Sequence, residues 1–145
     1  MKKTFISLIL LSAAMVASAA DFTVSGVHDS NIDKNGVRAV LSIPNAVYTP
    51  QLSVTYVNDV YTRYGAGAKY NFLKVGPVSF DATGSLVYQD TTRASNGFGA
   101  TVGLGASMPI SKNVSATATV DRFVGFGGLS GQNGMVYGVG VVAKF

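Results

Sequence analysis

His28, Asp29 and Ser30 are adjacent in the sequence and are the three residue types of a hydrolytic triad, in which His is the base, Asp orients it and Ser is the nucleophile. His28 is the only histidine of the chain, and glutamate is absent. Adjacent residues on a strand or tight loop do not point toward one another, whereas a triad forms from residues that converge in space. We therefore interpret His28 as a surface-loop residue and predict that the protein is not an enzyme.

Two further patterns resemble ligand sites. Polar residues at alternate positions, followed by a glycine, suggest a calcium loop: Asp29, Asn31, Asp33, Asn35 and Gly36. The glutamate that such a loop requires is missing and a strand pattern follows it, so we expect a solvated loop. Gly138, Gly140 and Ala143 match a dinucleotide fingerprint by letters alone, because no helix follows them. We predict no metal and no cofactor.

The elements that carry these residues alternate with a period of two. Strict alternation runs through residues 78–88, 97–108 and 135–145. Looser alternation marks residues 21–28, 37–43, 51–57, 63–72 and 113–121. Short connections at 73–77 and 109–113 alternate with longer polar or glycine-rich ones at 29–36, 90–96 and 125–134. We count eight strands and no helical pattern, which makes the class all-β.

The distribution of aromatic residues indicates where these strands lie. One face carries Ala, Val and Leu in the middle and aromatic or Met residues near the ends, as with Phe98 and Met108. An eleven-residue strand at ~3.3 Å per residue, tilted about 40°, rises roughly 28 Å, close to the apolar band of a membrane barrel. The opposite face is small and polar and would make a poor soluble core. We predict an eight-stranded antiparallel up-and-down transmembrane β-barrel, with a soluble secreted β-barrel or sandwich as the alternative.

The first twenty residues predict export. Two lysines precede an apolar run at 5–11 and the small residues "ASAA", which is the pattern of a cleaved signal peptide. Cleavage after Ala19 or Ala20 leaves one barrel domain, residues 21–145, with nine Lys/Arg against seven Asp, a net charge of +2. The positive residues are scattered, so we expect no nucleic-acid partner. The absence of cysteine excludes disulfides, a lipid-modified N-terminal cysteine and thiolate metal sites.

The inward faces carry the main polar set of the barrel. Its members are Arg38, Lys69, Asp81, Gln89, Asp121 and Lys144. If residues 73–77 form the turn, Phe72 faces Val78 and Lys69 lies directly across from Asp81, where opposite charges attract. The set forms either a charged constriction in a narrow channel or a plug. We favour the plug because eight strands enclose a space that side chains fill, although the inward glycines keep the channel open as an alternative.

Taken together, the signal peptide, the eight strands and the aromatic C-terminus resemble the small eight-stranded outer-membrane proteins of Gram-negative bacteria. The segments "YNFLKVGPVSFDATGSLVY" and "YGVGVVAKF" are similar to the YfaZ family. The wider resemblance implies that the barrel assembly machinery reads the last strand, with Gly138 standing where a polar residue is usual. Carried over by position, that signal consists of Tyr137, Gly140, Val141, Ala143 and Phe145.

The same resemblance implies an outer-membrane location, lipid surroundings and a structural or surface-interaction role. An extracellular ligand bound through the loops stays open. A narrow pore for ions or small solutes is the first alternative function. A lipid-modifying enzyme is disfavoured by the missing glutamate and by the position of His28.

Overall fold

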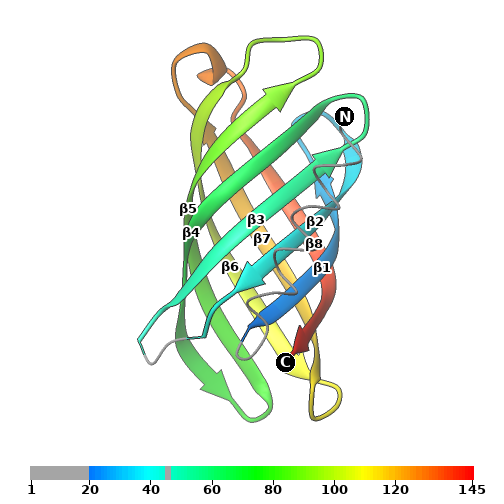
Figure 1. Ribbon diagram of the computed structural model, residues 1–145, viewed down its shortest axis with the longest axis vertical. Helices are drawn as coiled ribbons and strands as arrows, with labels where there is room; N and C mark the ends of the chain where they lie inside the picture. The colour runs from blue at the N-terminus through cyan, green and yellow to red at the C-terminus, as the bar shows by residue number, and fades with distance from the viewer. Residues whose placement is uncertain (1–19, 45–46) are drawn as a thin grey trace.

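The computed structural model describes residues 20–44 and 47–145, so the predicted signal peptide lies, except for Ala20, outside the described residues. Eight strands follow one another around a closed barrel, each antiparallel to its neighbours (Figure 1). They are β1 (Asp21–Asp29), β2 (Lys34–Ser42), β3 (Thr49–Val57), β4 (Tyr61–Val75), β5 (Val78–Thr91), β6 (Gly97–Pro109), β7 (Val114–Gly125) and β8 (Gly134–Lys144). A 3-10 helix, η1 (Gly127–Leu129), precedes β8. The prediction of an all-β, eight-stranded, up-and-down barrel is confirmed.

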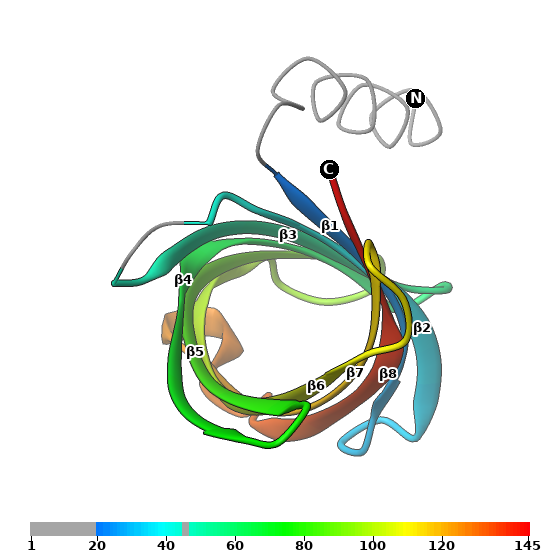
Figure 2. The ribbon, with the colours of Figure 1, turned by 90° about the horizontal axis from the view of Figure 1, so that it is seen from below.

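β1 and β8 close the ring. Their ladder runs without interruption from Asp21 opposite Lys144 to Asp29 opposite Val136. Figure 2, which looks along the barrel, shows the strands surrounding the interior completely. Closure leaves no free sheet edge, so the wall satisfies its own N–H and C=O groups without help from the solvent. Among the described residues, no helix is long and apolar enough to cross a membrane.

The two ends of the barrel differ. Asp21 and Lys144 lie at one end, here called the terminus end, together with the connections that follow β2, β4 and β6. The opposite end, here called the loop end, carries residues 30–33, 58–60, 92–96 and 126–133. The expected long loop at 29–36 is wrong, because the ladder continues through Asp29 opposite Lys34 and leaves four connecting residues. Backbone pairing there persists although the side chains are polar.

The strands are apolar outside and polar inside, as their alternation predicts. Leu86, Val102 and Val139 are exposed to fractions of 70%, 58% and 73%, and all point away from the interior. Tyr64, Tyr88 and Phe98 stand side by side on β4, β5 and β6 near the loop end. The rings of Tyr88 and Phe98 meet edge to face, with centroids 5.2 Å apart. Toward the terminus end, the exposed outward aromatics include Tyr70, Phe72 and Phe145.

The turn between β4 and β5 is tighter than the sequence suggested. Val75 pairs with Val78 around Gly76, whose positive φ of 57° suits glycine, and a bulge interrupts the ladder between Asn71 and Leu73. The register therefore places Lys69 opposite Thr83 and Asp81 opposite Asn71. The predicted direct pairing of Lys69 with Asp81 is wrong, because it assumed a wider turn and an unbroken ladder.

Candidate functional site

The loop end of the interior is filled around one arginine. The Arg63 guanidinium carbon lies 3.9 Å from the ring centroids of both Tyr61 and Phe123, so a cation is held between two aromatic faces. Arg63 Nε donates a hydrogen bond of 2.6 Å to Gln89 Oε1, and an Arg63 terminal nitrogen lies 3.3 Å from Asp29 Oδ2. The Tyr61 hydroxyl donates to the same Asp29 oxygen at 2.6 Å. We call these five residues the Arg63 cluster.

The Arg63 cluster is almost completely buried. Arg63 is 8% exposed, Asp29 is 2% exposed and Gln89 is 1% exposed. A buried charge is tolerated only where it is paired and hydrogen-bonded, and here each charged group has such partners. No buried side-chain nitrogen or oxygen among the described residues lacks a partner. These groups therefore fill the barrel and hold one another in place.

Sequence reasoning found only part of this cluster. Gln89 was predicted to be inward, and it is. Asp29 was assigned to a solvated loop, which is wrong, because β1 continues to Asp29 and places it inward. The inward series that starts at Asp21 and continues through Thr23 and Ser25 would have reached Asp29 if it had been extended by two more steps.

One loop contributes to the same filling. Leu129, which ends η1, is 0% exposed and forms an apolar cluster with Phe123 and Val87. Gln132 from the same loop accepts a 2.7 Å hydrogen bond from Gln89 Nε2. Residues 126–133 therefore fold back toward the barrel, so that an apolar and an amide side chain reach its interior. No sequence signal marked Leu129, because it lies in a glycine-rich segment without periodicity.

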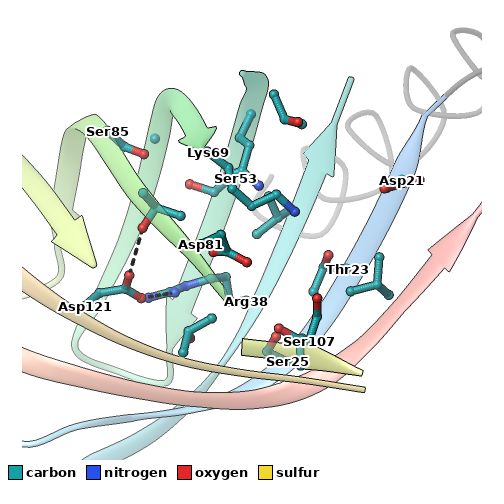
Figure 3. Close-up of a pocket in the computed structure, with 18 of the residues that line it drawn as sticks. Asp21, Thr23, Ser25, Arg38, Ser53, Lys69, Asp81, Ser85, Ser107 and Asp121 are labelled. Atoms are coloured by element: carbon teal, nitrogen blue, oxygen red, sulfur yellow. Dashed lines mark hydrogen bonds and ion pairs between the residues drawn. The ribbon is translucent and has the colours of Figure 1, made fainter. Parts of the chain in front are cut away.

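A second polar cluster lies nearer the middle of the barrel. Arg38 forms an ion pair with Asp121 (Figure 3). Arg38 Nε also donates a hydrogen bond of 3.1 Å to Thr55 Oγ1. Thr83 Oγ1 donates to the other Asp121 oxygen at 3.4 Å. Both charged residues were predicted to be luminal, but the sequence did not show that they pair. Each charge is neutralised in place, so this cluster also braces the wall.

A cavity of about 300 Å³ occupies the rest of the interior, on the terminus side of the Arg63 cluster. Serine, threonine and charged side chains line most of it, and we call it the vestibule. Lys69, Asp81 and Lys144 all line the vestibule, as Figure 3 shows for the first two. No ion pair within 4.0 Å joins Lys69 to Asp81. Because Lys144 and Asn71 on its lining are exposed, the vestibule opens at the terminus end.

The inward face of β6 carries mainly glycines, and side chains from neighbouring strands pack directly against them. We call these glycines the glycine floor. A Cβ atom on Gly99 would lie 2.6 Å from the Phe123 ring, and one on Gly105 would lie 2.5 Å from Asp81 Oδ1. A Cβ atom on Gly103 would overlap Asp121 Oδ1. The glycines therefore do not enlarge a channel, as the channel alternative supposed. They make room for the side chains that fill it.

Replacing Gly103 with alanine should lower the free energy of unfolding by about 1–3 kcal/mol, because the new methyl group would displace Asp121 and lie 2.8 Å from the Val120 carbonyl oxygen. The matched control is Gly84→Ala on β5, where a Cβ atom would meet nothing within 4 Å. Urea titration of both variants in lipid vesicles measures the difference. Equal loss in the two variants would show that the glycine floor has no packing role.

His28 and Ser30 do not form a catalytic arrangement. His28 Nδ1 lies 2.9 Å from Asn35 Oδ1, and its Nε2 lies 3.7 Å from Asp33. The Ser30 hydroxyl donates instead to the Met135 carbonyl oxygen at 2.9 Å. Within residues 20–44 and 47–145, no group of three or more His, Cys, Asp or Glu side chains is placed to hold a metal ion.

A closed eight-stranded wall with an apolar outside and a filled polar inside is the architecture of small transmembrane β-barrels. No family model matches the chain, and no curated protein matches it either. Solved structures do share its fold. The N-terminal β-barrel domain of Pseudomonas aeruginosa OprF superposes with a TM-score of 0.73 at 16% identity, over 89% of this chain and 98% of that one.

Two other natural barrels have the same fold. Neisserial surface protein A (NspA) gives a TM-score of 0.61 at 17% identity, over 88% of this chain and 95% of that one. The Yersinia pestis outer membrane protein Ail, in a phospholipid bilayer nanodisc, gives a TM-score of 0.61 at 11% identity, over 88% of this chain and 99% of that one. At these identities the comparisons establish the fold, and the chain shares it with small outer-membrane barrels.

Proposed function

We propose that this chain is an integral protein of the bacterial outer membrane, with a structural or surface-interaction role and no enzymatic activity. The observation that carries the proposal is the inverted polarity of the barrel. Large apolar side chains such as Leu86 and Val139 are exposed, whereas Asp29, Arg63 and Gln89 are buried. Water would be a poor solvent for such an exterior, while the apolar part of a bilayer would suit it.

The soluble alternative is disfavoured by the extent of this apolar exterior. Exposed large apolar side chains occur on the outward face of every strand except β7, as with Val24, Leu52 and Leu104. Soluble monomers rarely expose a continuous apolar patch larger than a few hundred Å². The aromatic side chains near both ends, among them Tyr88 and Tyr70, suit the two membrane interfaces.

A surface role is supported by the four connections at the loop end and by what two fold neighbours are called. One is named a surface protein and another an outer membrane protein. In such a role, the loop end would face outward from the cell and bind a ligand through residues 30–33, 58–60, 92–96 and 126–133. The narrower relationship to the YfaZ family is supported by residues 70–88 and 137–145 alone.

Export and assembly complete the proposal. Residues 1–20 act as a cleaved signal, and residues 21–145 form the barrel domain. The barrel assembly machinery reads the last strand through Tyr137, Gly140, Val141, Ala143 and Phe145. Phe145 is 71% exposed, and its backbone N–H donates a 3.3 Å hydrogen bond to the Ala20 carbonyl oxygen. Its ring is therefore accessible both to lipid and to an assembly factor.

Deleting Phe145 should sharply lower the amount of barrel inserted in living cells. The purified chain should still fold in lipid, with a loss of about 1–3 kcal/mol in unfolding free energy from one aromatic side chain that contacts lipid at the interface. Phe145→Tyr is the matched control and should nearly preserve both properties, because tyrosine also suits an interface. Quantifying the folded barrel in outer membranes and the unfolding free energy in vesicles separates the two roles. Unchanged insertion after the deletion would remove Phe145 from the assembly signal.

Fractionation of cells that express the chain tests the proposed function as a whole. We expect the protein in the outer-membrane fraction, resistant to carbonate extraction, and with different gel migration before and after boiling. Release into the soluble fraction together with identical migration would refute both the location and the membrane barrel. Binding of intact cells to immobilised host matrix proteins, compared with cells that lack the protein, then tests the surface role.

A further inference from the structure

The interior is open over one part of its length and filled over the other. The vestibule of about 300 Å³ reaches from the terminus end to Arg38, Thr55 and Arg63, which lie on its lining. Beyond Arg63, the side chains of Val57, Phe123, Leu129 and Val136 are at most 1% exposed. A path through the barrel would therefore need to cross only the loop-end filling.

This filling has two parts with different mechanical support. Val57 and Val136, like Tyr61 and the rest of the Arg63 cluster, belong to strands whose backbones are paired on both sides, so they can clear the axis only by rotation of their side chains within the intact wall. Leu129 and Gln132 instead come from residues 126–133, here called the lid, which connect β7 to β8. The lid is therefore the part of the filling whose backbone can move while the barrel stays intact.

Few interactions hold the lid against the interior. Three backbone hydrogen bonds, from the amides of Leu129, Ser130 and Gln132, stay within the lid itself, and a fourth joins the Phe126 amide at the base of the lid to the Phe98 carbonyl oxygen of β6 at 2.8 Å. Its side-chain bonds to the barrel are Gln89 to Gln132 at 2.7 Å and the Gly125 amide to Asn133 at 3.1 Å, the second of which lies at the base of the lid. Packing of Leu129 against Phe123 is the main remaining attachment.

The lid also contains suitable hinge residues. Gly127 has a φ of +53°, a conformation that glycine adopts without strain, and Gly128 and Gly131 follow it. When Leu129 leaves, it uncovers Gly97, whose added Cβ would lie 3.1 Å from the Leu129 side chain. Phe123, which is packed between Leu129 and Arg63, then gains room to rotate away from the axis.

We propose that the barrel passes small ions, and that residues 126–133 are the lid that opens this path at the loop end. The geometry that carries the proposal is a polar vestibule that stops at a filling partly made by a loop. The lining of the vestibule includes Lys69 and Lys144 as well as Asp21 and Asp81, so the path has weak charge selectivity. Passage goes beyond the structural role proposed above, which requires no opening.

The chain offers a direct way to lock the lid. A Cβ atom on Gly128 would lie 3.4 Å from the Cβ of Ser95 in the loop between β5 and β6, near the separation of about 3.5–4.5 Å that a disulfide needs. The chain has no cysteine, so the pair Ser95→Cys with Gly128→Cys would have no competing thiol. Oxidation should fix the lid in its closed position, and a reductant should release it.

The test is single-channel recording of the refolded full chain in planar bilayers, with potassium chloride as the probe. Leu129→Ala should raise the open probability by at least about tenfold, the factor that corresponds to about 1.4 kcal/mol, because the main apolar attachment of the lid is lost. Ser130→Ala is the matched control in the same loop, and its exposed side chain should change nothing. Adding the cysteine pair to Leu129→Ala should abolish the openings when oxidised and restore them when reduced.

Each result decides the proposal. Absence of openings in the folded Leu129→Ala variant would overturn it, as would openings that persist when mass spectrometry shows the disulfide fully formed. If Leu129→Ala does not fold, the cysteine pair is tested in the otherwise unchanged chain. Its openings should then disappear on oxidation and return on reduction. A reduced form that shows no openings overturns the proposal. Gel migration of each unboiled sample verifies folding. A folded membrane barrel that never conducts would refute the lid and leave the structural role intact.

Discussion

Replacing Arg63 with methionine should lower the free energy of unfolding by about 3–5 kcal/mol, because the change leaves the Asp29 carboxylate buried without its cationic partner. Asp29 is 2% exposed and, among the residues that the structure describes, keeps the Tyr61 hydroxyl and the Asn31 amide as its hydrogen-bond donors. Methionine retains much of the side-chain volume between the rings of Tyr61 and Phe123. The expected loss is therefore chiefly electrostatic.

The double variant Arg63→Met with Asp29→Asn is the control for this effect. Removing both charges should restore much of the lost stability, because no uncompensated charge then remains in the interior. Urea titration in lipid vesicles of the two single variants and the double variant gives the coupling free energy. Coupling within error of zero would mean that water enters the loop end and screens both groups, contrary to a plug.

Replacing Leu104 with lysine should cost about 2–4 kcal/mol, because the new charge would face the hydrocarbon near the middle of β6. Leu104 is 55% exposed on the outward face, between Ala82 and Val120 of the neighbouring strands. The matched control introduces the same residue on the opposite face. Thr117→Lys places the ammonium group in the vestibule and should cost no more than about 1 kcal/mol.

Unfolding titrations of both lysine variants in the same vesicles measure the contrast between the two faces. A larger loss of unfolding free energy for Thr117→Lys than for Leu104→Lys would mean that water surrounds the exterior and is excluded from the interior. Such a result would favour a soluble barrel over a membrane protein.

The strands and their faces could be predicted because a period of two is a local signal. Val102 and Leu104 alternate with Gly103 and Gly105 in the sequence itself, and the pleat of a strand turns that order directly into two faces. The class of transmembrane β-barrel could be predicted from the same alternation, because aromatic residues at both ends of an apolar face suit a bilayer. These features depend on neighbouring residues alone.

The register could not be predicted with the same success, because it depends on backbone geometry. The bulge at Phe72 and the tight turn at Gly76 together moved Lys69 two positions away from Asp81. The Gly76–Pro77 pair marks a turn but does not fix its length, and nothing in the sequence around Phe72 marks a bulge. An inference from cross-strand counting is therefore only as good as the turn from which the count begins.

The interior partners were missed because they are distant in the chain. Asp29 and Tyr61 are 32 residues apart, and Gln89 and Gln132 are 43 apart. Leu129 comes from a segment that reads as a flexible loop, yet it is completely buried. The inward glycines kept the channel open as an alternative in the sequence analysis, while in the structure Phe123 and Asp121 pack directly against two of them, Gly99 and Gly103.

Spin labelling along β5 tests most directly the central claim, which is that this barrel spans a bilayer with its apolar face toward lipid. Single cysteines at Thr83, Gly84, Ser85, Leu86 and Val87, each carrying a nitroxide, are compared in lipid vesicles for collision with molecular oxygen and with a water-soluble nickel chelate. We predict an oscillation of period two, with high oxygen and low nickel access at Gly84 and Leu86 and the reverse balance at Thr83 and Ser85. Nickel access at Leu86 as high as at Ser85 would place the exterior of the barrel in water and contradict this account.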